Sequence, residues 1–346
     1  MIYTKLPHTE IEVSKICLGT MTWGNQNTEE EGHEQINYAL DKGINFLDTA
    51  ELYPVPAHKD RYADTERVIG NWFKKNGNRE DIVLASKIAG KAEMTKFIRT
   101  TGFTREAIIE AVEGSLTRLQ TDYIDLYQLH WPDRNTNYFG QRGYKHDISD
   151  HWEDNIHQVL ETMRDLIREG KIKHVGLSNE TPWGTMRFLE ESKVHVTLPR
   201  TITVQNPYSL LNRLFEVGMS EIAMREQVGL LAYSPMGFGA LSGKYLGDRM
   251  PEGSRLSLFP QYNRYIGDTA VEATKKYYEL AQANGLTLAQ MALAFVNTRP
   301  FVTSTIIGAT NLRQLEENIG SIGVTLSDDV LKEIEAIHGS IPNPAP

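Results

Sequence analysis

Cysteine is almost absent from this chain, whose 346 residues include a single one, Cys17. A lone cysteine excludes internal disulfides and cysteine-built metal sites, and it is typical of proteins from a reducing compartment. The longest apolar runs, such as residues 291–296, are far too short to span a bilayer. The first residues also lack the charged and apolar regions of a signal peptide. We therefore expect a cytoplasmic protein that has no membrane partner.

An excess of positive charge is also missing. The 36 lysine and arginine residues are outnumbered by 45 aspartate and glutamate residues, which gives a formal net charge of −9 at pH 7. Without a basic excess to neutralise phosphates, the chain is not expected to bind nucleic acid or anionic membranes. A local basic pocket for one small anionic ligand remains compatible with this charge.

Eight short apolar runs recur along the chain, and we predict that each is a β-strand. They are nearly continuous in apolar character, which is typical of parallel strands covered on both faces. The predicted strands are residues 15–19, 44–48, 82–86, 124–129, 172–177, 202–205, 229–233 and 302–307.

Amphipathic segments between these runs predict helices. Thr28 with Glu31, and Thr287 with Gln290, have the spacing of capping boxes that begin helices. Apolar side chains of residues 105–119 fall on one face of a helix. Further helices are predicted over residues 157–168, 183–192 and 311–319.

Eight strands that alternate with helices predict an α/β fold, the (β/α)8 TIM barrel, with residues 1–346 as a single domain. Two stacked half-domains are the alternative, but they would need a linker, and no Ser/Gly/Pro-rich linker is present. The opening residues IYTKLPHTEIEV predict a β-hairpin that closes one end of the barrel. In such barrels the loops after the strands form the active-site face, so long excursions predict a built-up pocket there. The segments that exceed the needs of a barrel are 131–151, 234–267 and 327–346.

Polar side chains stand at or just beyond three consecutive predicted strands. Asp48 and Tyr53 follow the second strand, Lys87 the third and His130 the fourth. Each has an ordinary alternative, which is capping for Asp48, packing for Tyr53, solvation for Lys87 and a structural role for His130. Because strand ends meet on one face of a barrel, their joint appearance favours a catalytic site.

These four residue types together suit the reduction of a carbonyl group. A phenol has a pKa near 10, and a nearby ammonium favours the phenolate, so we expect Lys87 to lower the pKa of Tyr53. Asp48 would keep a buried Lys87 charged, and His130 would hydrogen-bond a substrate oxygen. Such a site can protonate a developing alkoxide, and it needs no metal.

Long motifs of the chain resemble those of the aldo-keto reductase superfamily. GINFLDTAELY (43–53) is similar to its N-terminal signature, and GSLTRLQTDYIDLYQLHWPD (114–133) to its central one. Within the superfamily the chain is similar to the bacterial Tas-type NADP(H)-dependent enzymes and, more distantly, to the β-subunits of voltage-gated potassium channels. Four further motifs extend the resemblance over essentially the whole chain, namely GLSN (176–179), QNPYSLL (205–211), YSPMGFGALSGKY (233–245) and IIGATNLRQLEEN (306–318).

The resemblance places the family's catalytic tetrad on the four residues selected from the strand ends. It implies NADPH or NADP as the cofactor, in preference to NAD. Side-chain amides at strand ends can pair with the nicotinamide carboxamide, although turn and helix capping would explain them equally well. The implied contacts on the nicotinamide side are Gly19, Thr20, Met21, Asp48, Ser178, Asn179, Gln205 and the stacking residue Tyr233.

The segment between residues 234 and 244 is rich in glycine and small residues, whose backbone N–H groups can approach a pyrophosphate. Neither G-x-G-x-x-G nor G-x-x-x-x-G-K-[ST] is present, so a Rossmann-type nucleotide site is not expected. The resemblance implies cofactor contacts from Ser234, Met236, Gly237, Gly239, Leu241, Ser242 and Lys244.

At the adenosine end, the N-terminus of the last predicted helix can hold a phosphate. Many relatives have an arginine where Gln314 stands, and the adjacent Arg313 should point elsewhere on the helix. The resemblance implies contacts from Arg255 to the 2′-phosphate and, nearby, from Gly308, Thr310, Gln314, Glu317 and Asn318.

The substrate pocket is expected to be aromatic and suited to an apolar aldehyde or ketone. Two insertions depart from the family pattern, PVPAHKDRYADTE (54–66) after the catalytic tyrosine and GKAEMTKFIRTTG (90–102) after the lysine, and both can narrow this pocket. Tyr138 or Phe139 would complete the wall, with ordinary loop packing as the alternative. The expected substrate contacts are Trp23, Tyr53, His130 and Trp131.

These features predict NADPH-dependent reduction of an aldehyde or ketone, with the hydride from nicotinamide and the proton from Tyr53. The alternative is an NADP(H)-binding regulatory or interaction protein with vestigial turnover, as the resemblance to channel β-subunits allows. A phosphate-sugar lyase or isomerase on the same barrel would leave Tyr53 and His130 without roles. We expect a small-molecule carbonyl compound as the substrate, and a monomer or weak homo-oligomer.

Overall fold

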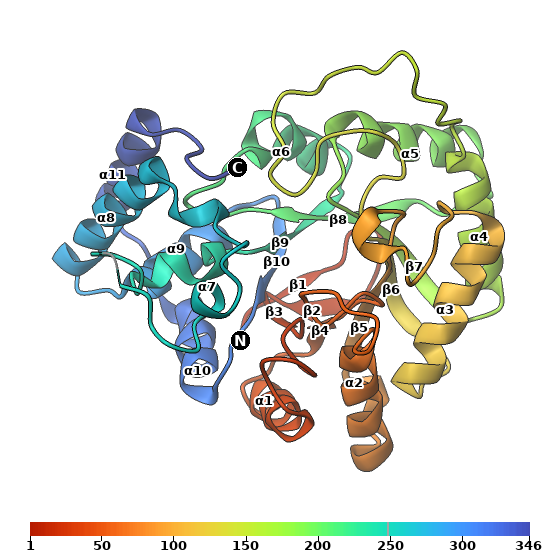
Figure 1. The fold of residues 1–346 in the computed structure, drawn as a ribbon, viewed down its shortest axis with the longest axis horizontal. Coiled ribbons are helices and arrows are strands. Elements are labelled where there is room, and N and C mark those ends of the chain that lie inside the picture. The colour runs from red at the N-terminus through yellow and green to blue at the C-terminus, as the bar shows by residue number, and fades with distance from the viewer. Residues whose placement is uncertain (248) are drawn as a thin grey trace.

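Eight parallel strands close into a barrel in the structure of the protein, a computed structural model that describes residues 1–247 and 249–346 (Figure 1). Each strand pairs with the next along the chain, and the last one pairs with the first to close the ring. The predicted TIM barrel is confirmed. The barrel strands are β3 (Ile16–Gly19), β4 (Phe46–Asp48), β5 (Val83–Ile88), β6 (Ile124–Leu129), β7 (Ile172–Ser178), β8 (Thr201–Pro207), β9 (Gly229–Tyr233) and β10 (Val302–Ile307).

All eight predicted strands are present, and those over residues 124–129, 229–233 and 302–307 have the predicted bounds. The largest consequence of a wrong boundary concerns β5, which continues two residues beyond the predicted end. Its ladder with β6 extends through Lys87 opposite Gln128 and Ile88 opposite Leu129. Lys87 therefore lies inside β5, whereas the sequence analysis predicts it just after the strand.

Helices surround the barrel, and their starts follow the capping signals in the sequence. Both predicted capping boxes form, Thr28 with Glu31 and Thr287 with Gln290. The α-helices are α1 (Glu29–Asp41), α2 (Asp64–Asn76), α3 (Arg105–Leu119), α4 (Ile156–Arg168), α5 (Pro182–Val194), α6 (Phe215–Arg225), α7 (Arg255–Leu258), α8 (Asp268–Ala283), α9 (Leu288–Asn297), α10 (Leu312–Gly320) and α11 (Asp328–Ser340). The 3-10 helices are η1 (Arg79–Asp81), η2 (Glu93–Thr95), η3 (Gly237–Ser242), η4 (Arg264–Ile266) and η5 (Ser321–Gly323).

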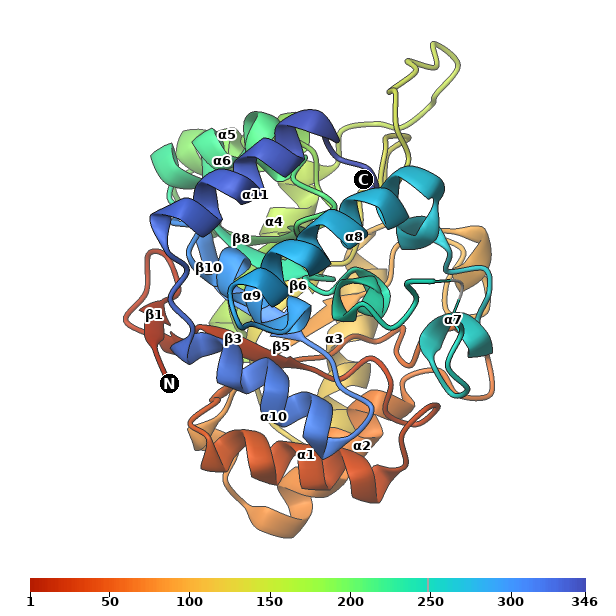
Figure 2. The ribbon, with the colours of Figure 1, turned by 90° about the vertical axis from the view of Figure 1, so that its left-hand side faces the viewer.

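The opening residues form the predicted hairpin, in which β1 (Tyr3–Lys5) pairs antiparallel with β2 (Glu12–Ser14). Leu6 and Val13 of this hairpin are fully buried in one cluster with inward-facing barrel residues such as Phe46 and Leu126. Figure 2 shows β1 on one side of the barrel and α7 on the opposite side. The hairpin therefore seals the end of the barrel that lies away from the long loops.

The long segments after β6 and β9 build up the open end of the barrel. The segment between β6 and α4 extends beyond α5 and α6 in Figure 1. The segment between β9 and α8 contains η3, α7 and η4. The third long segment, residues 327–346, is mostly α11. After this helix the chain returns to the segment that follows β8, where Ala345 N donates a hydrogen bond of 3.1 Å to Leu211 O. Among the described residues, no helix combines the length and the apolar character needed to cross a membrane.

Candidate active site

The structure brings the four predicted catalytic residues together at the open end of the barrel. Asp48 is the last residue of β4, Lys87 lies in β5, and His130 directly follows β6. Lys87 Nζ donates hydrogen bonds to Asp48 Oδ2 at 2.6 Å and to Thr49 O at 2.8 Å. The ammonium lies 4.9 Å from the centroid of the Tyr53 ring, and the ring centroids of Tyr53 and His130 are 5.8 Å apart. A phenol, an ammonium and an imidazole thus converge on one small volume.

Lys87 and Asp48 form a buried ion pair, with side chains 0% and 2% exposed. Burial alone would lower the pKa of Lys87, but the charges of Asp48 and Tyr53 and the hydrogen bonds that they make outweigh it and raise the pKa. The lysine is therefore charged at neutral pH, as the sequence predicts for a lysine held beside an aspartate.

The pKa of Tyr53 corrects one of the sequence predictions. The positive charge of Lys87 does lower this pKa, as expected, but burial of the phenol has the larger effect. The net result is a pKa above the ordinary value of 10.0. Tyr53 is therefore protonated at neutral pH, which is the state that a general acid needs.

His130 is held neutral at the same site. Burial and, to a smaller extent, the charge of Lys87 lower the pKa of its imidazole well below 6.5. Its Nδ1 atom is buried and has no hydrogen-bond partner among the described residues. A neutral imidazole can hydrogen-bond an oxygen without adding a second positive charge next to Lys87.

An ion pair that the sequence reasoning missed fixes the loop between Asp48 and Tyr53. Glu51 is almost completely buried, and its carboxylate accepts hydrogen bonds from Arg99 at 2.6 and 2.7 Å and from Ala89 N at 2.9 Å. Its own backbone N–H donates to Lys87 O at 3.1 Å. The one sign of this pair in the sequence is a carboxylate within an apolar segment at a strand end. Its partner, Arg99, lies 48 residues further along the chain, too far for a local pattern to indicate it.

Both insertions meet at this carboxylate. Arg99 belongs to the second insertion (90–102), and Tyr62 of the first insertion (54–66) donates from its hydroxyl to Glu51 Oε1 at 3.4 Å. Arg99 also donates to Ala89 O at 2.7 Å, so it ties the second insertion to the residue that follows β5 by one position. The two unusual segments are therefore joined to the catalytic loop through Glu51.

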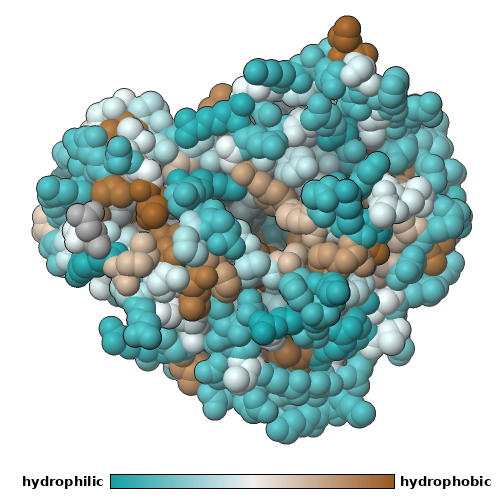
Figure 3. All heavy atoms as spheres, viewed as in Figure 1, coloured by the Kyte–Doolittle hydropathy of each residue, from teal (hydrophilic) through white to brown (hydrophobic). Residues whose placement is uncertain are grey.

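A cavity of about 1360 Å³ is lined by Asp48, Tyr53 and His130 and runs to the N-terminal end of α10, while Lys87 lies buried behind it. The surface is visibly hollowed in the middle of this face (Figure 3). Two of the predicted cofactor contacts, Gly237 and Leu241, are buried and do not line the cavity. The predicted cofactor residues that line it are Gly19, Thr20, Met21, Asp48, Ser178, Asn179, Gln205, Tyr233, Ser234, Met236, Gly239, Ser242, Lys244, Arg255, Gly308, Thr310, Gln314, Glu317 and Asn318.

The amides expected to hold a carboxamide bond to one another and to the catalytic residues. Gln205 Nε2 donates to Asp48 Oδ1 at 2.8 Å. Asn179 donates to His130 O at 2.9 Å and accepts from the Tyr233 hydroxyl at 2.6 Å. The Asn179 carbonyl oxygen has a second lone pair, so it can accept a further hydrogen bond from a ligand carboxamide.

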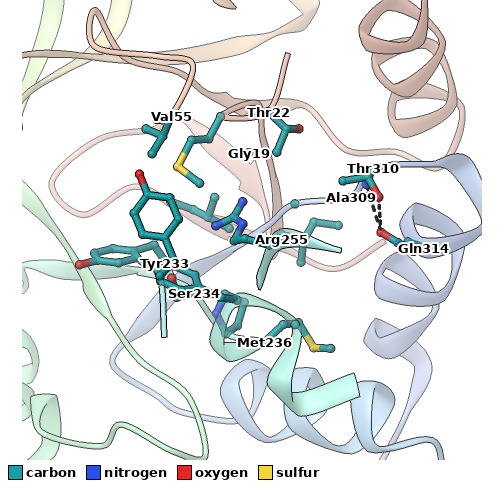
Figure 4. A pocket seen from close by; sticks show the side chains of 18 of the residues that line it. Gly19, Thr22, Val55, Tyr233, Ser234, Met236, Arg255, Ala309, Thr310 and Gln314 are labelled. Carbon is teal, nitrogen blue, oxygen red and sulfur yellow. Dashed lines mark hydrogen bonds between the residues drawn. The ribbon is translucent and has the colours of Figure 1, made fainter. Parts of the chain in front are cut away.

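Lys244 and Arg255 line the cavity, and neither forms an ion pair among the described residues. Among the described residues, no carboxylate lies within 4.0 Å of the charged nitrogen atoms of Lys244 or Arg255. Burial lowers the pKa of Arg255, which is the mark of a guanidinium placed inside the protein without a paired anion. In Figure 4 Arg255 projects into the cavity, between Gly19 on one side and Ser234 and Met236 on the other. The chemistry of this lining fits an anionic ligand such as a dinucleotide phosphate.

The far end of the cavity is built by the first turn of α10. Gln314 Oε1 accepts hydrogen bonds from the backbone N–H and the hydroxyl of Thr310, both at 3.1 Å (Figure 4). Asn318 Nδ2 donates to Gly308 O at 3.2 Å. These bonds hold the segment Gly308–Thr310 in place beside the helix terminus.

The predicted aromatic substrate wall is wrong for two tryptophans. Trp23 is fully buried, and its indole N–H donates to Gln35 Oε1 at 3.2 Å, so it packs behind the cavity against α1. Trp131 is also fully buried, because its indole lies against Gly90. Neither lines the cavity, whereas Tyr53 and His130 do, and so does Phe139 of the alternatives Tyr138 and Phe139.

The wall beside Tyr53 is mainly aliphatic, and the two insertions supply much of it. Val55 and Ala57 come from the first insertion, Met94 comes from the second, and Leu52 comes from the catalytic loop. This composition agrees with the expected apolar substrate, although sequence reasoning had named none of these residues.

Comparisons with known proteins agree with this architecture. Residues 15–338 match the family model described as "Aldo/keto reductase family". "Protein tas" of Escherichia coli (strain K12) is 48% identical over 353 residues, covering 100% of both chains. An "Aldo-keto reductase" of Babesia bovis is 40% identical over 275 residues, covering 74% of this chain and 95% of the relative. The "Uncharacterized oxidoreductase YrpG" of Bacillus subtilis (strain 168) is 32% identical over 346 residues, covering 97% and 96%. These matches support an oxidoreductase that acts on carbonyl compounds.

Proposed function

The chain belongs to the aldo/keto reductase family, and from this premise we propose that it is an NADPH-dependent reductase of apolar aldehydes or ketones. The observation that carries the proposal is the buried Asp48–Lys87 pair beside Tyr53 and His130, at a cavity whose cations lack carboxylate partners among the described residues. NADPH, when bound, supplies the hydride. The near absence of cysteine supports a reducing compartment such as the cytoplasm.

Each catalytic side chain has one task in this proposal. Neutral His130 hydrogen-bonds the carbonyl oxygen and orients it toward Tyr53. Tyr53 gives its phenolic proton to that oxygen as negative charge develops there. The ammonium of Lys87 stabilises the phenolate that remains, and Asp48 keeps Lys87 charged.

The cofactor would be held by the cavity residues that carry positive charge and by the amides near the tetrad. Arg255 and Lys244 would neutralise phosphates. Gln205 and Asn179 would hold the carboxamide, and the ring of Tyr233 would limit its orientation. The aliphatic wall from the two insertions would then receive the apolar part of the substrate.

A panel of aliphatic and aromatic aldehydes, assayed with NADPH and with NADH, tests the proposed function. Steady oxidation of NADPH that depends on an aldehyde would support it. Tight retention of NADPH without turnover across the panel would instead favour the regulatory binding protein, and it would refute the reductase.

Removal of the Arg255 guanidinium is expected to change the choice of cofactor. The variant Arg255→Ala should lose about 10-fold or more in kcat/KM for NADPH, since a charge-assisted bond to a phosphate contributes roughly 1.5–3 kcal/mol. The kcat/KM for NADH should change much less, because NADH lacks the 2′-phosphate. An unchanged NADPH-to-NADH ratio in this variant would remove Arg255 from the proposed phosphate site.

The pH dependence of reduction follows from two pKa directions. The acid form of Tyr53 is present below its pKa, which burial raises above 10.0, and the pKa of His130 is lowered well below 6.5. We therefore expect kcat at saturating substrates to stay level from about pH 7 to pH 9 and to decline only near or above pH 10. An inflection close to pH 7 would show that His130 or another essential group titrates, and it would contradict this assignment.

A further inference from the structure

Two histidines and a glutamate converge on the outside of the barrel, in a cluster for which the proposed reduction has no use. His157 lies in the first turn of α4, Glu191 lies in the last turn of α5, and His195 is the residue that caps the end of α5. One ligand atom from each of them lies within 4.8 Å of the others. Within residues 1–247 and 249–346, no other three histidine, cysteine or carboxylate side chains approach this closely.

The contacts inside this cluster are centred on one carboxylate oxygen. His157 Nδ1 lies 2.6 Å from Glu191 Oε1, and His195 Nε2 lies 3.3 Å from the same oxygen. The two imidazole rings meet edge to face, with centroids 4.7 Å apart. Two nitrogen atoms and one oxygen atom from two helices therefore point into a common space.

Arg187 holds the carboxylate of Glu191 in one orientation. Arg187 Nη1 bonds the other oxygen, Glu191 Oε2, at 2.5 Å, and Arg187 Nε bonds Asp154 Oδ2 at 2.8 Å. The carboxylate of Glu191 is thus fixed in orientation through Oε2, while its Oε1 atom faces the two histidines.

The far nitrogen of His157 also has a carboxylate in reach. His157 Nε2 lies 3.8 Å from Glu161 Oε2, one helical turn further along α4. Metal-ligating histidines commonly donate their second N–H to such a carboxylate, which sets the tautomer and the ring orientation. A small movement of either side chain would bring Glu161 into hydrogen-bond distance, so it can support a His157 that ligates through Nδ1.

We propose that His157, Glu191 and His195 form a binding site for a divalent transition-metal ion of the zinc type. Two imidazoles and one carboxylate are ligands that Zn²⁺ accepts, with water in the remaining position. Ligand atoms bound to zinc at about 2.0–2.1 Å lie roughly 3.4 Å from one another, so the imidazoles need to move by only about 1 Å. Their side chains are 45% and 47% exposed, which gives an ion access and gives the rings room to move.

An ion at this site would brace one helix against the next. Asp154, which anchors Arg187, lies at the end of the long segment between β6 and α4, and Figure 1 shows α4 beside α5. The ion would therefore join the N-terminal end of α4, where this segment ends, to the C-terminal end of α5. Because binding stabilises only the folded chain, Zn²⁺ should raise the Tm.

Titration of the full-length protein with Zn²⁺ alone, after treatment with a chelator, tests this site by calorimetry. We expect one high-affinity ion per chain, and a loss of affinity of roughly 10-fold or more in each of His157→Gln and His195→Gln. The matched control is His58→Gln, since His58 is an exposed histidine with a single carboxylate, Asp60, at 3.5 Å. Equal affinity in wild type and in the His157→Gln/His195→Gln double variant would overturn the proposal, as would the absence of Zn²⁺ binding.

A second measurement needs no variant. Zn²⁺ should slow the chemical modification of His157 and His195 by diethyl pyrocarbonate, followed by mass spectrometry, while modification of His58 continues at its original rate. If all three histidines react equally fast with and without Zn²⁺, the ion does not bind at this cluster.

Discussion

The variant Tyr53→Phe is expected to reduce aldehydes about 10²–10⁴-fold more slowly than the wild-type protein, which is the range that a general acid contributes. The substitution removes only the hydroxyl and keeps the ring, which packs beside His130 and near Lys87. NADPH should therefore bind as before, and the loss should fall on kcat. Stopped-flow or steady-state assays of NADPH oxidation, together with fluorescence titration of NADPH, separate these two quantities.

Tyr123→Phe is a matched control for this experiment. Tyr123 lies before β6, and its ring packs against the cations of Arg79 and Lys173, far along the strand from His130. Removal of its hydroxyl should leave kcat unchanged. Full activity in Tyr53→Phe would show that another group protonates the substrate, and the proposed mechanism would fall.

The largest effect on stability is expected from Arg99→Ala. The side chains of Arg99 and Glu51 are 8% and 2% exposed, so this substitution leaves a buried carboxylate without its counter-charge. Breaking a buried ion pair in this way costs about 3–5 kcal/mol. The free energy of unfolding, measured by urea denaturation at constant slope, should fall by this amount.

Two comparisons decide whether the isolated charge causes this loss. The partly exposed pair of Arg105 and Asp165 gives a control, since Arg105→Ala should cost less than about 1 kcal/mol. Adding Glu51→Gln to Arg99→Ala removes the unpaired charge and should recover part of the lost stability. If the double variant were less stable than Arg99→Ala, the charge would not be the cause.

Activity should decline in Arg99→Ala even under conditions where the protein stays folded. Glu51 lies between Asp48 and Tyr53, and its backbone N–H bonds the carbonyl oxygen of Lys87. Release of its carboxylate loosens the segment that carries the phenol. We expect a lower kcat with little change in the KM for NADPH, because neither Glu51 nor Arg99 lines the cavity that would hold the cofactor.

Local sequence patterns are sufficient to predict the barrel and the position of its catalytic candidates. Each strand is a short apolar run, and the alternation with capped helices leaves few other folds. The barrel topology alone then brings Asp48, Lys87 and His130 to one face, so their proximity follows without knowledge of any long-range side-chain contact.

Features that depend on packing between distant segments could not be predicted in the same way. Trp23 follows a strand end, as a pocket residue would, but its indole is buried in the interior and donates a hydrogen bond to Gln35 of α1. The pairing of Glu51 with Arg99 joins residues on two segments without regular spacing. The net pKa of Tyr53 depends on how deeply the phenol is buried, and the sequence carries no measure of that depth.

The meeting of both insertions at Glu51 has a consequence for loop exchange between relatives. A graft that transfers residues 90–102 alone brings in Arg99 without the surroundings supplied by residues 54–66, and the reverse graft leaves Glu51 and Tyr62 without the guanidinium. The two loops form one transferable module, although 23 residues separate them in the chain. A transfer of this cavity wall to a relative should therefore move both loops together, with the carboxylate to which they bind.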